Sequence, residues 1–182
     1  MKKVTAIFLI IFSLLSLCSC ADKNEQEEKH FFVNGAEITQ DEIDFFKARE
    51  RAAIISEFSS EYNVSDFSTF WETEYDGVTP QEALEKRALQ SAAEAKVKLL
   101  EMKKRGIYDE ITWDFFRKMA EEYNRTHEVT STVGLKSIDM SSFYIYYLST
   151  GEIELKKALR EDGISDYDSY ISSLIEAMET TE

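Results

Sequence analysis

The sequence predicts an all-α domain of about five helices, with at most a short strand near its N-terminus. Three observations support this fold class. Apolar residues recur at spacings of three and four along most of the chain, which is the period of one face of a helix. Two Thr-x-x-Glu sequences, beginning at Thr39 and Thr79, have the pattern of helix N-terminal capping boxes. No run of alternating apolar and polar residues is long enough to predict a larger sheet.

The domain is expected to begin with a short apolar stretch at residues 31–33, which an Asn-Gly turn ends. The capping box at Thr39 predicts a first helix over residues 40–59. Residues 61–77 follow, and they are rich in aromatic side chains without a helical period. We therefore expect this region to be a loop or a short helix.

The second helix is the clearest element of the sequence. Its capping box begins at Thr79, and a proline occupies the first helical position, where a missing N–H costs nothing. An apolar stripe continues to Met102, and Gly106 ends the helix behind three basic residues. A third helix is expected to start near Thr112, before an irregular segment over residues 125–135.

Two further helices are expected toward the C-terminus. The fourth covers residues 141–161, and Gly151 inside it weakens the helix by about 1 kcal/mol relative to alanine and allows a bend there. Ser165 is predicted to be the N-cap of a last helix, whose apolar residues extend to Met178. All of these helices belong to one predicted domain over residues 30–182.

The composition is strongly acidic. The 182 residues include 35 Asp and Glu but only 21 Lys and Arg. A nucleic-acid partner is not expected, because phosphate binding needs clustered basic residues. The same charge keeps the domain soluble and holds it away from a negatively charged membrane surface. With 43% hydrophobic residues, the chain has enough apolar material for a core without cross-links.

Residues 1–20 have the order of a secretory signal: a basic start, an apolar run over residues 4–17 and small residues before Cys20. The run is shorter than the roughly 18 residues that span a bilayer. The sequence Leu-Cys-Ser-Cys at residues 17–20 resembles the lipobox of bacterial lipoproteins. The resemblance implies that a peptidase removes residues 1–19 and that a lipid such as palmitate on Cys20 anchors the protein to the extracytoplasmic face of a cell membrane. The alternative is an ordinary signal peptide, which the agreement of charge, length and small residues disfavours.

Cysteine content limits the chemistry of the domain. The two cysteines, Cys18 and Cys20, lie in or directly after the signal, so the domain itself has no disulfide, thiol nucleophile or thiolate metal ligand. Residues 20–29 are polar and charged, and they are expected to form a flexible tether between the lipid and the domain. The domain must therefore fold on its hydrophobic core alone.

Residues 32–42, Phe-Val-Asn-Gly-Ala-Glu-Ile-Thr-Gln-Asp-Glu, resemble the opening of the SurA/PrsA-type extracytoplasmic foldases. The end of the long helix at residues 104–107 and the aromatic run at residues 143–147 are similar to later parts of the same module. The resemblance covers about residues 31–160 and implies a helical chaperone module, which binds unfolded polypeptides. Those foldases also carry parvulin isomerase domains, for which this chain has no room, because such a domain needs about 100 residues. The resemblance therefore implies a chaperone module without peptidyl-prolyl isomerase activity.

No arrangement of residues predicts an enzyme, a cofactor or a metal site. The two histidines, His30 and His127, lack partners at metal-ligand spacing. Asp162, Asp166 and Asp168 do not follow the ligand order of an EF-hand, and a solvated turn with a helix cap explains them. The sequence has no phosphate-binding loop, nucleophile elbow or dinucleotide-binding glycine pattern. We therefore expect no catalytic activity.

Aromatic side chains are the candidates for a binding site, because unfolded polypeptides expose apolar groups that need apolar partners. We expect most of them to pack in the core and about a third to line a groove, with the loop over residues 67–71 as the first candidate. The leading hypothesis is a chaperone-like lipoprotein that binds unfolded or apolar polypeptide segments. The alternative is an accessory lipoprotein that docks one envelope or secretion partner. The candidate residues are Phe46, Phe67, Phe70, Trp71, Trp113, Phe116, Tyr144 and Tyr147.

Overall fold

The computed structural model describes residues 30–130, 137–178 and 180–181. The predicted signal, Cys20 and the predicted tether lie outside these residues, as do residues 131–136 of the segment predicted to be irregular. Helices dominate the described part, which confirms the predicted all-α class. The helices are α1 (Gln40–Tyr62), α2 (Pro80–Lys104), α3 (Trp113–Thr130), α4 (Met140–Glu161) and α5 (Tyr167–Glu176), and the strands are β1 (Phe31–Val33), β2 (Ala36–Ile38) and β3 (Thr180–Thr181).

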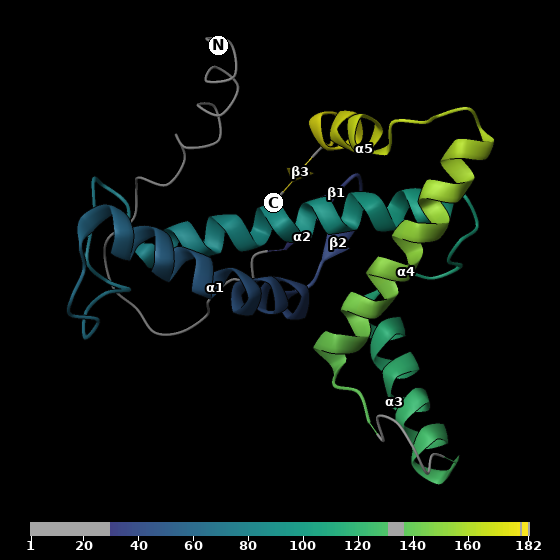
Figure 1. Ribbon diagram of the computed structural model, residues 1–182, viewed down its shortest axis with the longest axis horizontal. Helices are drawn as coiled ribbons and strands as arrows, with labels where there is room; N and C mark the ends of the chain where they lie inside the picture. The colour runs from purple at the N-terminus through teal and green to yellow at the C-terminus, as the bar shows by residue number, and fades with distance from the viewer. Residues whose placement is uncertain (1–29, 131–136, 179, 182) are drawn as a thin grey trace.

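Helix α2 is the centre of the fold. Helices α1 and α2 lie side by side and run in opposite directions, so together they form a long helical hairpin (Figure 1). Helix α4 crosses α2 near the C-terminal end of α2, and α3 packs along the N-terminal half of α4. Helix α5 contacts α2 on another side. None of the described helices combines the length and the apolar character that a membrane-spanning helix needs.

A small antiparallel sheet in the order β2-β1-β3 packs against α2. The N-terminal strand that the sequence predicts is the first arm of a hairpin, in which Val33 pairs with Ala36 around the Asn-Gly turn. Both turn residues have positive φ, 49° at Asn34 and 77° at Gly35, as a two-residue hairpin turn requires. Strand β3 then pairs with β1, so the sheet joins the two ends of the described domain.

Several helix boundaries differ from the predictions, and α1 ends three residues later than expected, at Tyr62. Helix α3 continues to Thr130, through a stretch for which the sequence predicts irregular structure from residue 125 onward. Arg125 forms an ion pair with Glu122 one turn earlier, at 2.6 Å, and this pair supports the helix there. The N-cap of α5 is Asp166 and not Ser165, because the Asp166 carboxylate accepts a hydrogen bond from the backbone N–H of Ser169 at 3.0 Å.

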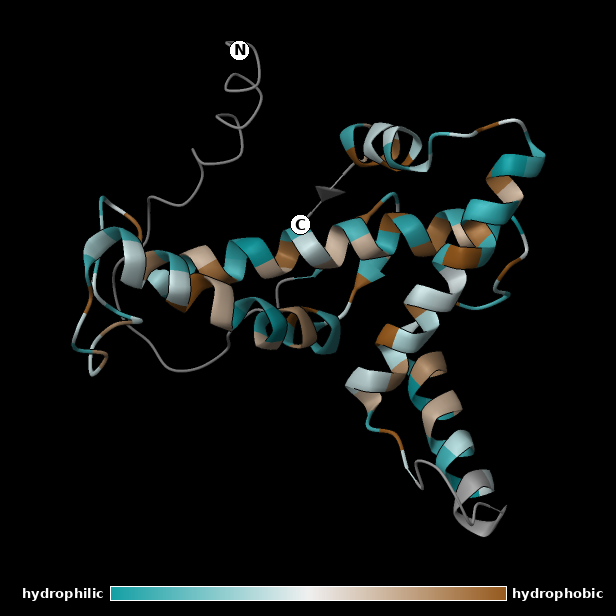
Figure 2. Cartoon of the chain, viewed as in Figure 1, coloured by the Kyte–Doolittle hydropathy of each residue, from teal (hydrophilic) through white to brown (hydrophobic). Residues whose placement is uncertain are grey.

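The hydrophobic core lies where α1, α2, α3 and α4 meet. Figure 2 shows apolar and polar residues interleaved along each of these helices, as expected for helices with one buried face. The centre of the core is aromatic. The Tyr144 ring lies 5.0 Å from the Phe45 ring, 4.9 Å from the Trp113 ring and 5.2 Å from the Phe116 ring, measured between ring centroids. Such edge-to-face contacts fix the orientation of the helices as well as burying area.

A buried carboxylate, that of Glu42, lies beside this aromatic centre. Its Oε2 atom accepts hydrogen bonds from the backbone N–H and the hydroxyl of Thr39, at 2.9 and 3.2 Å, which completes the predicted capping box. Its Oε1 atom lies 2.6 Å from Nζ of Lys96 on α2, and the two side chains are only 2% and 4% exposed. Burial and the neighbouring Glu42 charge raise the pKa of Tyr144, which hydrogen-bonds to Glu42 from α4. One carboxylate thus links α1, α2 and α4.

A second buried carboxylate, Glu101, holds the C-terminal part of the domain. The Tyr170 hydroxyl on α5 donates a hydrogen bond to Glu101 at 2.8 Å, and Nε of Arg105 donates another at 2.6 Å. Arg105 also forms an ion pair with Asp162 at the end of α4. Burial acts to raise the pKa of Glu101, but the hydrogen bonds from Tyr170 and Arg105 outweigh it and lower that pKa. Glu101 is therefore a charged acceptor that ties α5 to α2.

Gly151 lies where α4 crosses α2, and α4 continues through it as one helix. A β-carbon at this position would lie 2.6 Å from Sδ of Met102 and 2.8 Å from Cε2 of Tyr108. Met102 is fully buried, and the Tyr108 hydroxyl donates to the Tyr147 carbonyl oxygen at 2.7 Å, so neither side chain can easily move aside. The glycine therefore permits the close approach of the two helices.

We predict that Gly151→Ala destabilises the protein by about 1–2 kcal/mol. Alanine improves helix propensity by about 1 kcal/mol, but contacts under 3.0 Å with Met102 and Tyr108 place the overpacking cost in the upper part of its usual range, about 2–3 kcal/mol. Urea unfolding measures the difference. Ser149→Ala, at an exposed position of the same helix, is the control and should change stability by less than about 0.5 kcal/mol. A Gly151→Ala variant as stable as the wild type would show that the crossing does not require glycine.

Candidate functional site

The connection between α1 and α2, residues 63–79, is the candidate site, and we call it the α1–α2 loop. Asn63 begins it in the left-handed conformation, with φ 52°. Asp66 accepts a hydrogen bond from the backbone N–H of Ser68 at 2.9 Å, which forms a local turn. Tyr75 and Val78 exchange two backbone hydrogen bonds of 3.0 and 3.1 Å across a second tight turn. The loop is therefore a structured segment without a regular helix, whereas the sequence allows either a loop or a short helix.

Phe70 anchors this loop in the domain. Its side chain is 1% exposed, and its ring packs edge-on against that of Phe58 on α1, with 6.2 Å between centroids. The Phe67 and Trp71 rings lie 5.3 and 5.0 Å from the Phe70 ring. The guanidinium of Arg51 stacks over Trp71 at 4.1 Å, which is a cation–π contact. These contacts hold the loop in one arrangement.

The outer surface of the loop is apolar at two positions. Phe67 is 48% exposed and Val78 is 43% exposed, although Phe70 in the same loop is buried. Exposed residues that are held by a packed core lose little entropy when a partner covers them. The loop therefore offers a small preformed apolar contact at the far end of the α1–α2 hairpin, on the left in Figure 1.

The eight candidate aromatic residues divide into core and surface. Trp71 and Tyr147 are half-buried, and Phe67 is exposed. The other five are buried, four on helices whose apolar stripes pack against their neighbours and Phe70 in the loop. Of these five, Trp113 also lines a cavity that is described below. As candidates for direct binding they are corrected to core residues: Phe46, Phe70, Trp113, Phe116 and Tyr144.

Three exposed apolar residues are absent from the candidate set. Val78 lies in the α1–α2 loop, and Tyr146 and Ile153 lie on α4. Tyr146 and Ile153 are seven residues apart, so they share one face of α4, opposite the buried residues. The helical period of the sequence already places both residues off the buried stripe, so it could have predicted their exposure. Val78 carries no such signal, because its exposure depends on the turn that precedes it.

Two cavities of the described part bear on the predicted groove. One, of about 370 Å³, lies between α4 and α5 and is lined mainly by polar side chains. The other, of about 320 Å³, lies between β2, α2 and the start of α3, and Trp113 is the one candidate aromatic residue in its lining. Neither of these two cavities is a broad aromatic cleft.

The polar candidates have local structural partners. His30 hydrogen-bonds to Glu37 at 2.9 Å on the surface, Asp162 pairs with Arg105, and Asp166 caps α5. The side chain of His127 lies outside the described residues. Within the described ranges, no three His, Cys, Asp or Glu side chains are arranged to hold a metal ion.

Comparison of the chain with protein-family models, with curated proteins and with solved structures finds no match.

Proposed function

We propose that this protein is a lipid-anchored, extracytoplasmic lipoprotein that binds apolar polypeptide segments through the α1–α2 loop, without a catalytic step. The observation that carries the proposal is the exposure of Phe67 and Val78 on a loop that Phe70 fixes from inside. Aromatic residues on a rigid support are the usual anchors of polypeptide recognition. The proposed tether of residues 20–29 would keep the domain within about 35 Å of the lipid on Cys20.

Two forms of this function differ in how many partners the loop accepts. The small exposed area favours an accessory lipoprotein that docks one partner, because five of the eight candidate aromatic residues are core residues. A general chaperone for unfolded polypeptides is the second form. The resemblance of residues 32–42 to SurA/PrsA-type foldases supports it. In the structure these residues lie in two short strands joined by an Asn-Gly turn and in the capped start of α1.

Lipid anchoring predicts that Cys20→Ala abolishes lipidation and signal removal. In a bacterial host, wild-type protein should partition into the detergent phase after cloud-point extraction and carry acyl groups on Cys20 by mass spectrometry. Cys18→Ala is the matched control, because it removes the neighbouring cysteine and should leave lipidation intact. Acylation that persists in Cys20→Ala, or a wild-type protein without acyl groups, would contradict the anchor.

Polypeptide binding predicts that Phe67→Ser combined with Val78→Ser impairs suppression of aggregation of an unfolded test protein. Tyr146→Ser combined with Ile153→Ser is the matched control, because it removes two exposed apolar residues from α4 instead. Urea unfolding checks that both double variants stay folded in the assay, because Phe67 also contacts Phe70 whereas Tyr146 and Ile153 are exposed on α4. If the two double variants impair suppression equally, the loop is not the contact.

If the wild-type protein does not suppress aggregation at molar excess, the general-chaperone form is contradicted. Docking of one partner is then the remaining form of the proposed function. Photo-crosslinking in cells from position 67, with position 153 as control, then separates the outcomes. A single adduct specific to position 67 supports docking of one partner, and many adducts support the chaperone. Equal patterns at both positions would contradict polypeptide binding by the loop.

A further inference from the structure

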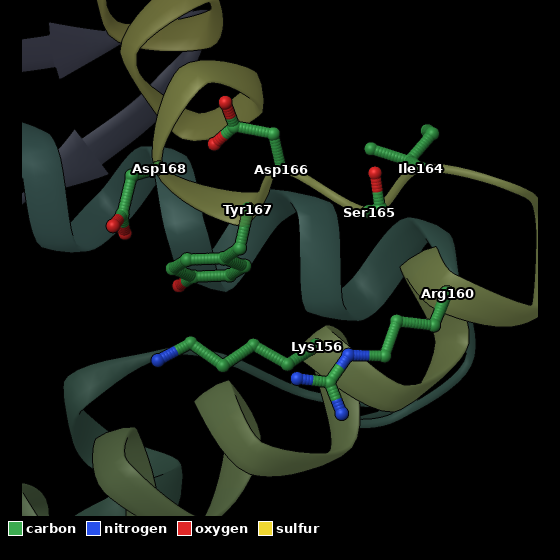
Figure 3. Close-up of a pocket in the computed structure, with 7 residues that line it drawn as sticks. All are labelled: Lys156, Arg160, Ile164, Ser165, Asp166, Tyr167 and Asp168. Carbon is green, nitrogen blue, oxygen red and sulfur yellow. The ribbon is translucent and has the colours of Figure 1, made fainter.

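The cavity of about 370 Å³ lies between the C-terminal half of α4 and the start of α5, far from the α1–α2 loop (Figures 1 and 3). Lys156 and Arg160 line it from α4, and Ser165 and Tyr167 line it from the start of α5. Its volume is at the lower end of the range for small-molecule sites, about 300–1,000 Å³. Most of its exposed lining is polar, so a charged or polar ligand suits it better than an apolar one.

The positive charges of this cavity have no carboxylate partners. Lys156 and Arg160 are four residues apart on α4, so they lie on one face of the helix. Neither forms an ion pair with any described residue, although acidic residues outnumber basic ones by 35 to 21. Two like charges at this spacing repel each other by about 0.2–0.5 kcal/mol. The helix dipole favours Arg160 in the last turn of α4, and Lys156 lies over the Tyr167 ring, but neither contact neutralises the charge. An anionic ligand between the two side chains would neutralise it.

Tyr167 provides a hydrogen-bond donor in the same cavity. Its hydroxyl oxygen is buried and has no hydrogen-bond partner in the described structure. Its ring lies 4.5 Å from Nζ of Lys156, and Figure 3 shows the two side chains next to each other. Burial, with the nearby charges of Glu152 and Asp168, raises the pKa of Tyr167, so its hydroxyl stays protonated at neutral pH. A buried hydroxyl without a partner indicates a ligand or water that completes it.

The start of α5 adds one further donor. The backbone N–H of Tyr167 is in the first helical turn, where helix geometry leaves it without an intrahelical acceptor. The backbone N–H of Asp168 is directed at the Asp166 carboxylate instead. The Asp166 carboxylate is already engaged by the N–H and the hydroxyl of Ser169, at 3.0 and 2.7 Å. In Figure 3 it points away from Lys156 and Arg160. Asp168 is exposed on the rim and is the one acidic group of the cavity that stays available.

We propose that the cavity between α4 and α5 binds the phosphate group of a small anion or of a phospholipid headgroup, with Lys156 and Arg160 as the charged ligands and the Tyr167 hydroxyl as a donor. Charge-assisted hydrogen bonds from lysine and arginine to a phosphate are the strongest that side chains offer. The proposal is independent of polypeptide binding, because the cavity and the α1–α2 loop share no residues.

The test is binding of two probes to the mature protein in a non-ionic detergent, measured by calorimetry. Inorganic phosphate is the first probe, and dihexanoyl phosphatidylglycerol below its micelle concentration is the second. Lys156→Gln combined with Arg160→Gln should weaken binding at least tenfold. Lys157→Gln removes one charge at an exposed neighbouring position outside the cavity lining and should leave binding unchanged. Binding of phosphate alone indicates a free anion, and tighter binding of the lipid indicates a headgroup.

Tyr167→Phe separates a binding role from a structural one. The variant loses a buried hydroxyl that has no partner, so its free energy of unfolding in urea should equal or slightly exceed that of the wild type. Binding of the probe should weaken about threefold. The proposal is overturned if neither probe binds the wild type at ~20 mM, because a site that stays empty at this concentration has a dissociation constant too high for specific binding. It is also overturned if Lys157→Gln weakens binding as much as the double variant.

Discussion

The fold depends most on one buried carboxylate. Glu42 accepts hydrogen bonds from Thr39 and so caps α1, and the same carboxylate pairs with Lys96 on α2 and meets the Tyr144 hydroxyl of α4. A charge in a nearly closed core is costly unless it is paired and hydrogen-bonded. Only an arrangement that brings three helices together satisfies it, so this group selects one packing of the helices over alternatives with a similar apolar content.

The rest of the architecture extends from this centre along α2. Toward the C-terminal end of α2, Gly151 allows α4 to cross closely, and Glu101 binds α5 through Tyr170. Toward the N-terminal end, Phe70 holds the α1–α2 loop and leaves Phe67 outside. The two proposed binding regions therefore lie at separate places on one scaffold. A polypeptide at the loop and an anion at the cavity beside α5 could be bound without competition.

Local signals in the sequence predicted most of the fold, and contacts between distant residues account for what they missed. The capping boxes at Thr39 and Thr79 and the turn at Gly106 act within a few residues, so they are readable in sequence. The pairing of Glu42 with Lys96 is not readable, because a lysine in a helix usually faces solvent. The same limit applies to the candidate site. Aromatic content marked the loop, but only the packing of Phe70 decides that Phe67 is outside.

The most direct test of this account is a double-mutant cycle on the buried pair, measured as the free energy of unfolding in urea. Glu42→Gln and Lys96→Met should each cost about 3–5 kcal/mol, because each leaves an opposite charge buried without its partner. Glutamine at position 42 can still complete the capping box, which separates the pair from the cap. The account predicts that the double variant loses clearly less than the sum of the two single losses. Additive losses would show that the two charges do not depend on each other and would contradict the central role of Glu42.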